Sequence, residues 1–120
     1  MFGSRKVPTE TPRDVYDAMT RGEVILIDVR EPNEYAVERI HGALLFPLST
    51  FDPASLPDEF GKQVVLQCGS GKRSEMAYNK AVAAGVKVRG HMGGGIMAWK
   101  AAGLPVIATD PSSGVIRDRS

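Results

Sequence analysis

The sequence predicts an α/β domain with a central, mostly parallel sheet of about five strands and helices on both faces. Apolar, strand-like runs alternate along the chain with stretches of helical pattern, which is the order that parallel β-α-β units require. Residues 24–29 form a continuous β-branched run, as expected of a strand buried on both faces. No internal repeat and no linker interrupts this order, so the 120 residues are expected to form one domain.

The first helix is expected to begin at Thr11. The Thr11 hydroxyl can cap the helix, and Pro12 suits the first helical position because its nitrogen needs no hydrogen-bond acceptor. Apolar residues recur at helical spacing at Val15, Ala18 and Met19. Gly22 then ends the helix, and the chain enters the strand at residues 24–29.

Shorter elements are expected in the middle of the chain. Pro32 starts a short helix that runs to Glu38, and residues 43–46 form a second strand, which Pro47 stops. Residues 49–61 hold prolines and a glycine, which predicts a loop with at most one short helix.

The second half continues the alternation. Residues 63–67 form the third strand, and a helix follows over residues 75–84. Residues 86–88 start a further strand, and the glycines at 93–95 turn the chain into a helix at 96–101.

The two ends of the chain are polar. We therefore expect residues 1–10 to form a flexible N-terminus, residues 11–107 the folded domain, and residues 108–120 a flexible C-terminal tail.

The one cysteine, Cys68, lies where the third strand meets a glycine-rich loop and a helix start. A lone cysteine is usually a small buried hydrophobe, but here Gly69, Gly71, Lys72 and Arg73 follow directly. The glycines let the loop turn its amides inward, and the amides, cations and helix start all favour thiolate over thiol. Because ligands bind beyond the carboxyl ends of parallel strands, Cys68 is the expected nucleophile.

Composition and charge narrow the function. The net charge is +1 with scattered basic residues, so neither a nucleic-acid nor a membrane partner is expected. One cysteine excludes an internal disulfide and a cysteine-based zinc site, and His41 and His91 are too few and too isolated to imply a metal; no cofactor is expected. The sequence has no apolar segment of spanning length and no apolar signal core, so a cytoplasmic protein is expected.

Four segments stand out in order along the chain: residues 28–35 (DVREPNEY), 40–47 (IHGALLFP), 68–74 (CGSGKRS) and 93–106 (GGGIMAWKAAGLPV). Together they resemble the rhodanese-like family, specifically a single-domain thiosulfate sulfurtransferase. The resemblance extends over nearly the whole expected domain and implies the rhodanese-like fold.

The resemblance also implies the family's chemistry. A cysteine thiolate attacks the outer sulfur of a donor such as thiosulfate, sulfite leaves, and the cysteine persulfide passes its sulfur to a thiophilic acceptor such as cyanide or a thiol. Cys68 matches the nucleophile. The implied partners are a small-molecule sulfur donor and acceptor, with a protein sulfur acceptor as a further option.

The residues after Cys68 are expected to bind the substrate. This set is Gly69, Ser70, Gly71, Lys72, Arg73 and Ser74. Arg73 is expected to contact an anionic donor, because a helix N-terminus disfavours a cation that no ligand balances. Ser74 either donates a hydrogen bond to the sulfur or donor, or caps the next helix.

Two further groups flank the expected site. By their place in the family motif, Asp28 and Arg30 most simply brace the surrounding loops through charge-assisted hydrogen bonds, with substrate contact as the alternative. His41 starts a strand and His91 precedes the glycine turn, so neither is expected to act in catalysis.

Other functions remain open. Phosphatases and arsenate reductases of this fold place five residues between cysteine and arginine to surround an oxyanion, whereas four separate Cys68 from Arg73, which favours sulfur transfer. A persulfide carrier or regulatory module would also need the cysteine. The Cys-Gly-Ser-Gly opening resembles mercaptopyruvate sulfurtransferases, but the Lys-Arg pair suits a small dianion, so thiosulfate is the expected donor.

Overall fold

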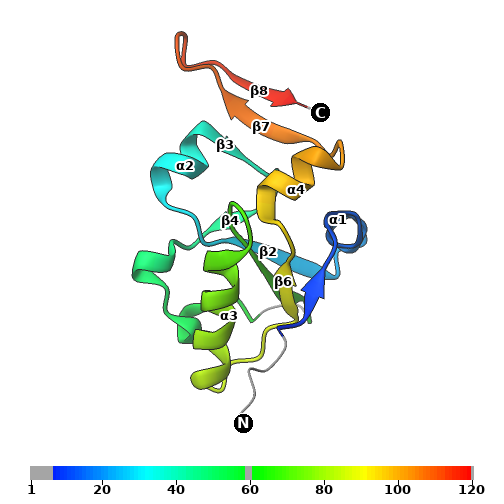
Figure 1. Ribbon diagram of the computed structural model, residues 1–120, viewed down its shortest axis with the longest axis vertical. Coiled ribbons are helices and arrows are strands. Elements are labelled where there is room, and N and C mark those ends of the chain that lie inside the picture. Colours follow the sequence, from blue (N-terminus) through cyan, green and yellow to red (C-terminus); the bar gives the residue numbers. More distant parts are fainter. Residues whose placement is uncertain (1–6, 59–60, 120) are drawn as a thin grey trace.

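The central sheet has five parallel strands in the spatial order β1, β6, β5, β2, β4 (Figure 1). The structure is a computed structural model that describes residues 7–58 and 61–119. In spatial order the strands are Thr9–Glu10, Gly90–Met92, Gln63–Gln67, Val24–Asp28 and Leu44–Leu45. The predicted α/β architecture with a parallel sheet of about five strands is confirmed.

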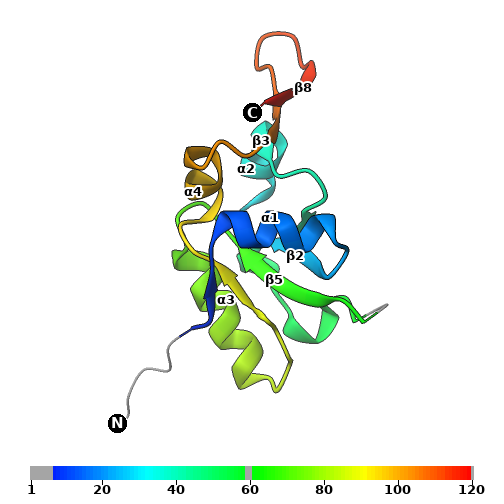
Figure 2. The same ribbon diagram turned by 90° about the vertical axis from the view of Figure 1, so that its right-hand side faces the viewer.

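Helices cover both faces of this sheet, as predicted (Figures 1 and 2). On one face, α1 (Pro12–Thr20) and α4 (Gly95–Ala101) bury side chains against the strands in one apolar cluster. On the other face, α3 (Lys72–Ala83) contributes to a second cluster, together with residues that follow the 3₁₀ turns η1 (Leu48–Thr50) and η2 (Pro53–Ser55).

Strand alternation decides which face each side chain of β5 reaches. Val65 belongs to the cluster under α1 and α4, whereas Val64 and Leu66 belong to the cluster under α3. Successive side chains of a strand point to opposite faces. Cys68, two positions after Leu66, therefore lies on the α3 side.

The first half of the chain follows the sequence-based prediction closely. The Thr11 hydroxyl accepts a hydrogen bond from the Asp14 amide at 3.1 Å, and Pro12 is the first residue of α1. The helix α2 covers Pro32–Val37, and it begins at the predicted proline.

The second half contains two corrections to the predicted elements. The helix α3 begins at Lys72, three residues earlier than expected, and Gly71 is its N-cap. Residues 86–88 do not start a strand, because the Val86 amide bonds back to the Ala81 carbonyl and closes the C-terminus of α3. Strand β6 starts only at Gly90, which pairs with Val65.

Within the expected flexible tail, residues 108–120, residues 108–109 and 116–119 belong to a second, antiparallel sheet, and Ser120 lies outside the described residues. The strands of this sheet are β3 (Glu38–Arg39), β7 (Val106–Thr109) and β8 (Ile116–Arg119), in that spatial order. The Asp110 carboxylate accepts the Ser112 amide at 2.8 Å and so closes the turn between β7 and β8. At the other end, Thr9–Glu10 of the expected N-terminal arm form the edge strand β1. Residues 1–6 of that arm lie outside the described residues.

Candidate active site

Cys68 is the first residue after β5 and is fully buried. The loop that follows it is short, because α3 already starts at Lys72. The sulfur is therefore enclosed between the end of a central strand and the N-terminus of a helix, where backbone N–H groups have no intrahelical acceptor.

The Cys68 sulfur accepts hydrogen bonds from that helix start. The Gly71 and Ser74 amides lie 3.1 and 3.3 Å from Sγ. The Ser74 hydroxyl oxygen lies 3.5 Å from it. Burial by itself raises the pKa of the thiol, but the hydrogen bonds from Ser74, Gly71 and Ser70 outweigh burial and hold the pKa below its ordinary value. The site therefore favours a thiolate, which is the nucleophilic form of cysteine.

Two glycines make this close packing feasible. Gly71 has a φ of +109°, a conformation that L side chains rarely adopt. Gly95, at the start of α4, has a φ of +58°, and a Cβ there would lie 2.1 Å from the Cys68 carbonyl oxygen. Without that Cβ, the Ile96 amide reaches the Cys68 carbonyl at 2.8 Å. The glycine turn before α4 thus fixes the backbone of Cys68.

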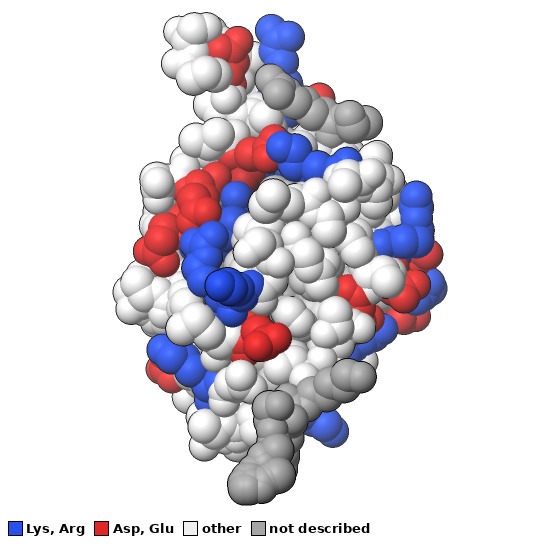
Figure 3. All heavy atoms as spheres, in the orientation of Figure 1, with Lys and Arg blue, Asp and Glu red and all other residues white. Residues whose placement is uncertain are grey.

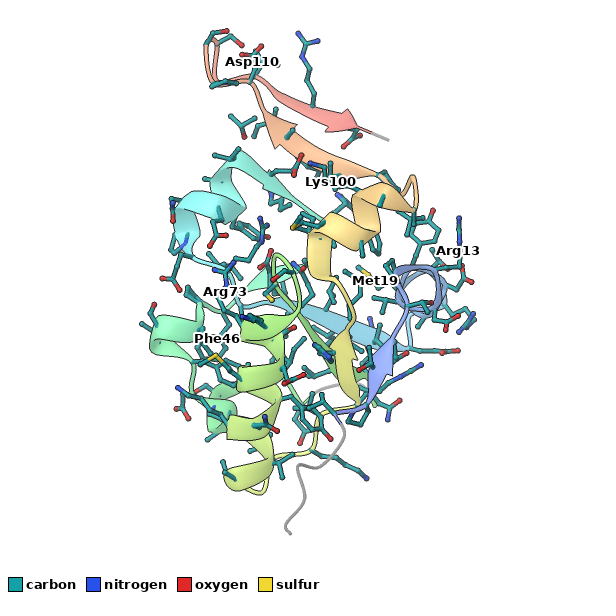
Figure 4. The ribbon with its side chains drawn as sticks, in the orientation of Figure 1. Arg13, Met19, Phe46, Arg73, Lys100 and Asp110 are labelled. Carbon is teal, nitrogen blue, oxygen red and sulfur yellow. The ribbon has the colours of Figure 1, made fainter. Side chains whose placement is uncertain are left out.

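Arg73 is held by a carboxylate that is distant in sequence. Its two terminal nitrogens bond the two oxygens of Glu34 on α2, at 2.6 and 3.0 Å. This guanidinium lowers the pKa of Glu34 from 4.5 to about 2, against the effect of partial burial. Figure 4 labels Arg73 near the start of α3. The ion pair ties α2 to the first turn of α3, and sequence reasoning did not identify it.

The other predicted substrate-binding residues lie on the solvent side of the loop after Cys68. Ser70 and Lys72 are exposed, and Gly69 is partly buried. Ser70, Gly71 and Lys72 line a surface hollow of about 570 Å³. Its other lining residues are Glu75, Met76, His91 and Gly94. The loop therefore presents polar groups to solvent on one side and amides to the sulfur on the other.

Asp28 and Arg30 form a buried ion pair at the end of β2. The Arg30 Nη2 atom lies 2.8 Å from Asp28 Oδ2, and it also donates to the Glu38 carbonyl oxygen at 2.7 Å. The Arg30 amide bonds Asp28 Oδ1 at 2.9 Å. The pair thus connects β2 to the start of β3, a geometry that suits the predicted bracing role.

Ser74 is not the N-cap of α3, because Gly71 occupies that position. Its side chain is fully buried and lies between Cys68 and His91, with Ser74 Oγ 2.8 Å from His91 Nδ1. His91 was not expected to act in the site, yet its ring lies beside Ser74. It reaches the site because β6 pairs directly with β5, which places His91 opposite Leu66. The sequence-based prediction started this strand at residues 86–88 instead of at Gly90, so it could not show that His91 pairs with Leu66.

Charges of both signs surround this region. Figure 3 shows acidic and basic side chains side by side over α2 and α3. Within residues 7–58 and 61–119, no group of three or more His, Cys, Asp or Glu side chains could hold a metal ion. The described helices include none with the length and apolar character needed to cross a bilayer.

Comparison with protein families gives one match that covers most of the chain. Residues 11–102 match the rhodanese-like domain. An uncharacterized protein from Synechocystis is 43% identical over 101 residues, which cover 84% of this chain and 56% of that protein. The chain therefore spans only about half the length of that relative.

A shorter relative and a solved structure show the same likeness. A sulfurtransferase from Allochromatium vinosum is 33% identical over 88 residues, covering 73% of this chain and 82% of that protein. The crystal structure of a rhodanese-related protein from Thermoplasma volcanium superposes with a TM-score of 0.71 at 26% identity. The superposed region covers 82% of this chain and 95% of the Thermoplasma chain.

Proposed function

Because the chain belongs to the rhodanese-like domain family, we propose that it moves a sulfane sulfur from thiosulfate, or a related donor, to a thiophilic acceptor through a Cys68 persulfide. The observation that carries this proposal is the buried Cys68 sulfur, which accepts the Gly71 and Ser74 amides. The sulfurtransferase from Allochromatium vinosum supports the reaction class.

The proposed cycle has two displacement steps. The Cys68 thiolate attacks the outer sulfur of thiosulfate, a new S–S bond forms, and the old S–S bond breaks with its electron pair leaving on sulfite. The acceptor then attacks the outer sulfur of the persulfide and regenerates the thiolate; cyanide leaves as thiocyanate. This is covalent catalysis in which donor and acceptor react in turn.

The neutral donors around Cys68 suit both states of the sulfur. N–H groups that are fixed before the reaction stabilise an anion without reorganisation. The Gly71 and Ser74 amides stabilise the thiolate, and we expect the free loop amides to receive the terminal sulfur of the persulfide. Gly69, Ser70, Gly71, Lys72, Arg73 and Ser74 are accordingly the proposed substrate-binding residues.

Donor binding is assigned to the loop cations. Lys72 is exposed beside the hollow, where it can attract a small dianion. Arg73 has five N–H donors, and Glu34 takes two of them. The remaining donors can contact an anion while Glu34 keeps the guanidinium in place. Asp28 and Arg30 hold the neighbouring strand end and do not take part in the chemistry.

The spacing of the loop weakens the phosphatase alternative. Only four residues separate Cys68 from Arg73, one fewer than phosphatases use to surround a tetrahedral oxyanion. A persulfide carrier uses the same first step and differs only in its acceptor, which could be another protein. A reducing compartment such as the cytoplasm would keep the single thiol available.

Intact-protein mass tests this proposal. Incubation with thiosulfate should add the mass of one sulfur atom to the wild type, and cyanide should remove it. The Cys68→Ser variant should gain no sulfur mass. It should keep the fold, because only one side-chain atom differs from the wild type. A sulfur adduct on Cys68→Ser would contradict the persulfide mechanism. No adduct on the wild type would contradict thiosulfate as donor, and mercaptopyruvate would be tested in the same way.

A further inference from the structure

Ser74 connects the Cys68 sulfur to a buried histidine. Its Oγ lies 2.8 Å from His91 Nδ1 and 3.5 Å from Cys68 Sγ. On the other side of the ring, His91 Nε2 lies 3.3 Å from Thr9 Oγ1, and Thr9 donates to the Val7 carbonyl at 2.9 Å. Since His91 is only 5% exposed and Ser74 is fully buried, bulk water competes little for these contacts.

The direction of each hydrogen bond follows from the protons available. Thr9 gives its one hydroxyl proton to a carbonyl, so its oxygen accepts from His91 and Nε2 carries the ring proton. His91 Nδ1 is then an acceptor, and at 2.8 Å it takes the hydroxyl proton of Ser74 in preference to the Gly71 carbonyl, which lies 3.1 Å from Ser74 Oγ. The Ser74 oxygen is left to accept the thiol proton of Cys68.

We propose that His91 is the proton acceptor for Cys68 and acts through the Ser74 hydroxyl. The thiol proton moves to Ser74 Oγ while the Ser74 proton moves to His91 Nδ1. The products are a thiolate and an imidazolium, with no proton gained or lost overall. Ser74 then donates to the thiolate, and Nδ1–H donates to Ser74. Because His91 does not touch the sulfur, it is a positioning residue for the nucleophile.

The groups that face His91 are compatible with this exchange. Burial lowers the pKa of His91 and so favours the neutral ring, whereas the Glu75 carboxylate on α3 opposes that shift and favours the imidazolium. Lys72, also on α3, lines the same hollow. On β1, Glu10 is engaged by Arg89 at 2.8 Å.

The relay rests on the proposed role of Cys68, but it can be tested without any sulfur donor. Cys68 is the only cysteine, so the ultraviolet absorbance of its thiolate, with Cys68→Ser as the blank, reports its ionisation alone. His91→Asn keeps a polar group near the position of Nδ1 but cannot take up a proton. We expect an about tenfold lower thiolate-to-thiol ratio at neutral pH in this variant.

Three further variants sharpen the test. Ser74→Ala should raise the thiol pKa as His91→Asn does, and the double variant should add little, because both changes interrupt one path. His41→Asn, which alters the other histidine, should leave the thiol titration unchanged. An unchanged titration in folded His91→Asn, or additive effects in the double variant, would overturn the relay.

A second measurement covers the case in which His91→Asn does not fold. NMR titration of the His91 ring should give a lower pKa in Cys68→Ser than in the wild type, because the thiolate no longer stabilises the imidazolium. An equal ring pKa in the two proteins would overturn the relay. A normal relay in a protein that gains no sulfur would instead contradict the proposed sulfur transfer.

Discussion

The ends of two neighbouring strands, β2 and β5, handle charge in opposite ways. The strands lie side by side, with Asp28 opposite Gln67 in the parallel register. Beyond β2, the buried Asp28 carboxylate meets the buried Arg30 guanidinium at 2.8 Å. Beyond β5, the Cys68 sulfur meets amides and a hydroxyl, which stabilise an anion without neutralising it.

The difference separates the scaffold from the reactive group. An ion pair in a low-dielectric interior fixes geometry, because breaking it leaves a buried charge without a partner. Neutral dipoles lower the free energy of a thiolate and leave its electron pair available for attack. One edge of the central sheet therefore carries both a buried ion pair and a stabilised thiolate site.

The largest expected effect on stability is at the buried ion pair of Asp28 and Arg30. Asp28→Ala leaves the Arg30 guanidinium buried and unpaired, which should cost about 3–5 kcal/mol of unfolding free energy. Chemical denaturation measures this loss. Glu23→Ala is the matched control, because Arg21 and Glu23 have the same spacing in an exposed pair and little change is expected. Equal losses in both variants would show that burial does not make the Asp28 pair special.

The next-largest expected effect is on the rate of persulfide formation, through the backbone position of Cys68. Gly95→Ala forces a Cβ against the Cys68 carbonyl, so the loop must move, and persulfide formation should slow by about a hundredfold. Gly103→Ala is the matched control, with a φ of +76° but no atom within 4 Å of the added Cβ. Stopped-flow or quenched mass measurements give both rates. If the two variants lose activity equally, backbone strain rather than loop displacement is the cause.

A smaller, selective effect is expected at Arg73. Arg73→Ala should raise the KM for the donor, while discharge of a preformed persulfide by cyanide should keep its rate. Steady-state kinetics with varied donor separate the two steps. Glu34→Gln keeps the Arg73 guanidinium but removes the carboxylate that holds it. An increase in the donor KM of Glu34→Gln would therefore mean that the placement of the guanidinium matters. An unchanged donor KM in Arg73→Ala would contradict the donor-binding role.

The smallest expected effect is a loss of folding stability at acid pH, through the ion pair of Glu34. The pKa of Glu34 is lowered from 4.5 to about 2, so its ion pair stabilises the fold above the ordinary pKa and is lost as the pH falls through about 2. Because both side chains are 34% exposed, the contribution should be at most about 1 kcal/mol. Glu34→Gln should be less stable than the wild type at pH 7 and equally stable at pH 2. A constant difference across this range would contradict the assignment.

Local signals were enough to predict most of the sheet and the position of Cys68 at the end of a central strand. The cap at Thr11, the apolar run of β2 and the glycines after Cys68 each act within a few residues. The Arg73–Glu34 pair could not be predicted in this way, because 39 positions separate its members. The position of His91 beside Ser74 was missed because it depends on the register between β5 and β6, which local sequence patterns do not reveal.

The C-terminal strand β8 also could not be predicted from local sequence patterns. Ile116 is 59% exposed, so β8 lacks the apolar pattern that marks a buried strand. It forms through backbone pairing with β7, which in turn pairs with β3. Long-range pairing of this kind leaves little trace in local composition.

Cys68 is both fully buried and the only cysteine in these 120 residues. A second thiol could release the persulfide sulfur by closing an internal disulfide, but this domain has none. Under the proposed chemistry, each molecule therefore stores a single sulfur atom until another molecule collects it. The turnover of the domain would then follow the concentration of its collector, and the loop that encloses Cys68 would decide which collectors gain access.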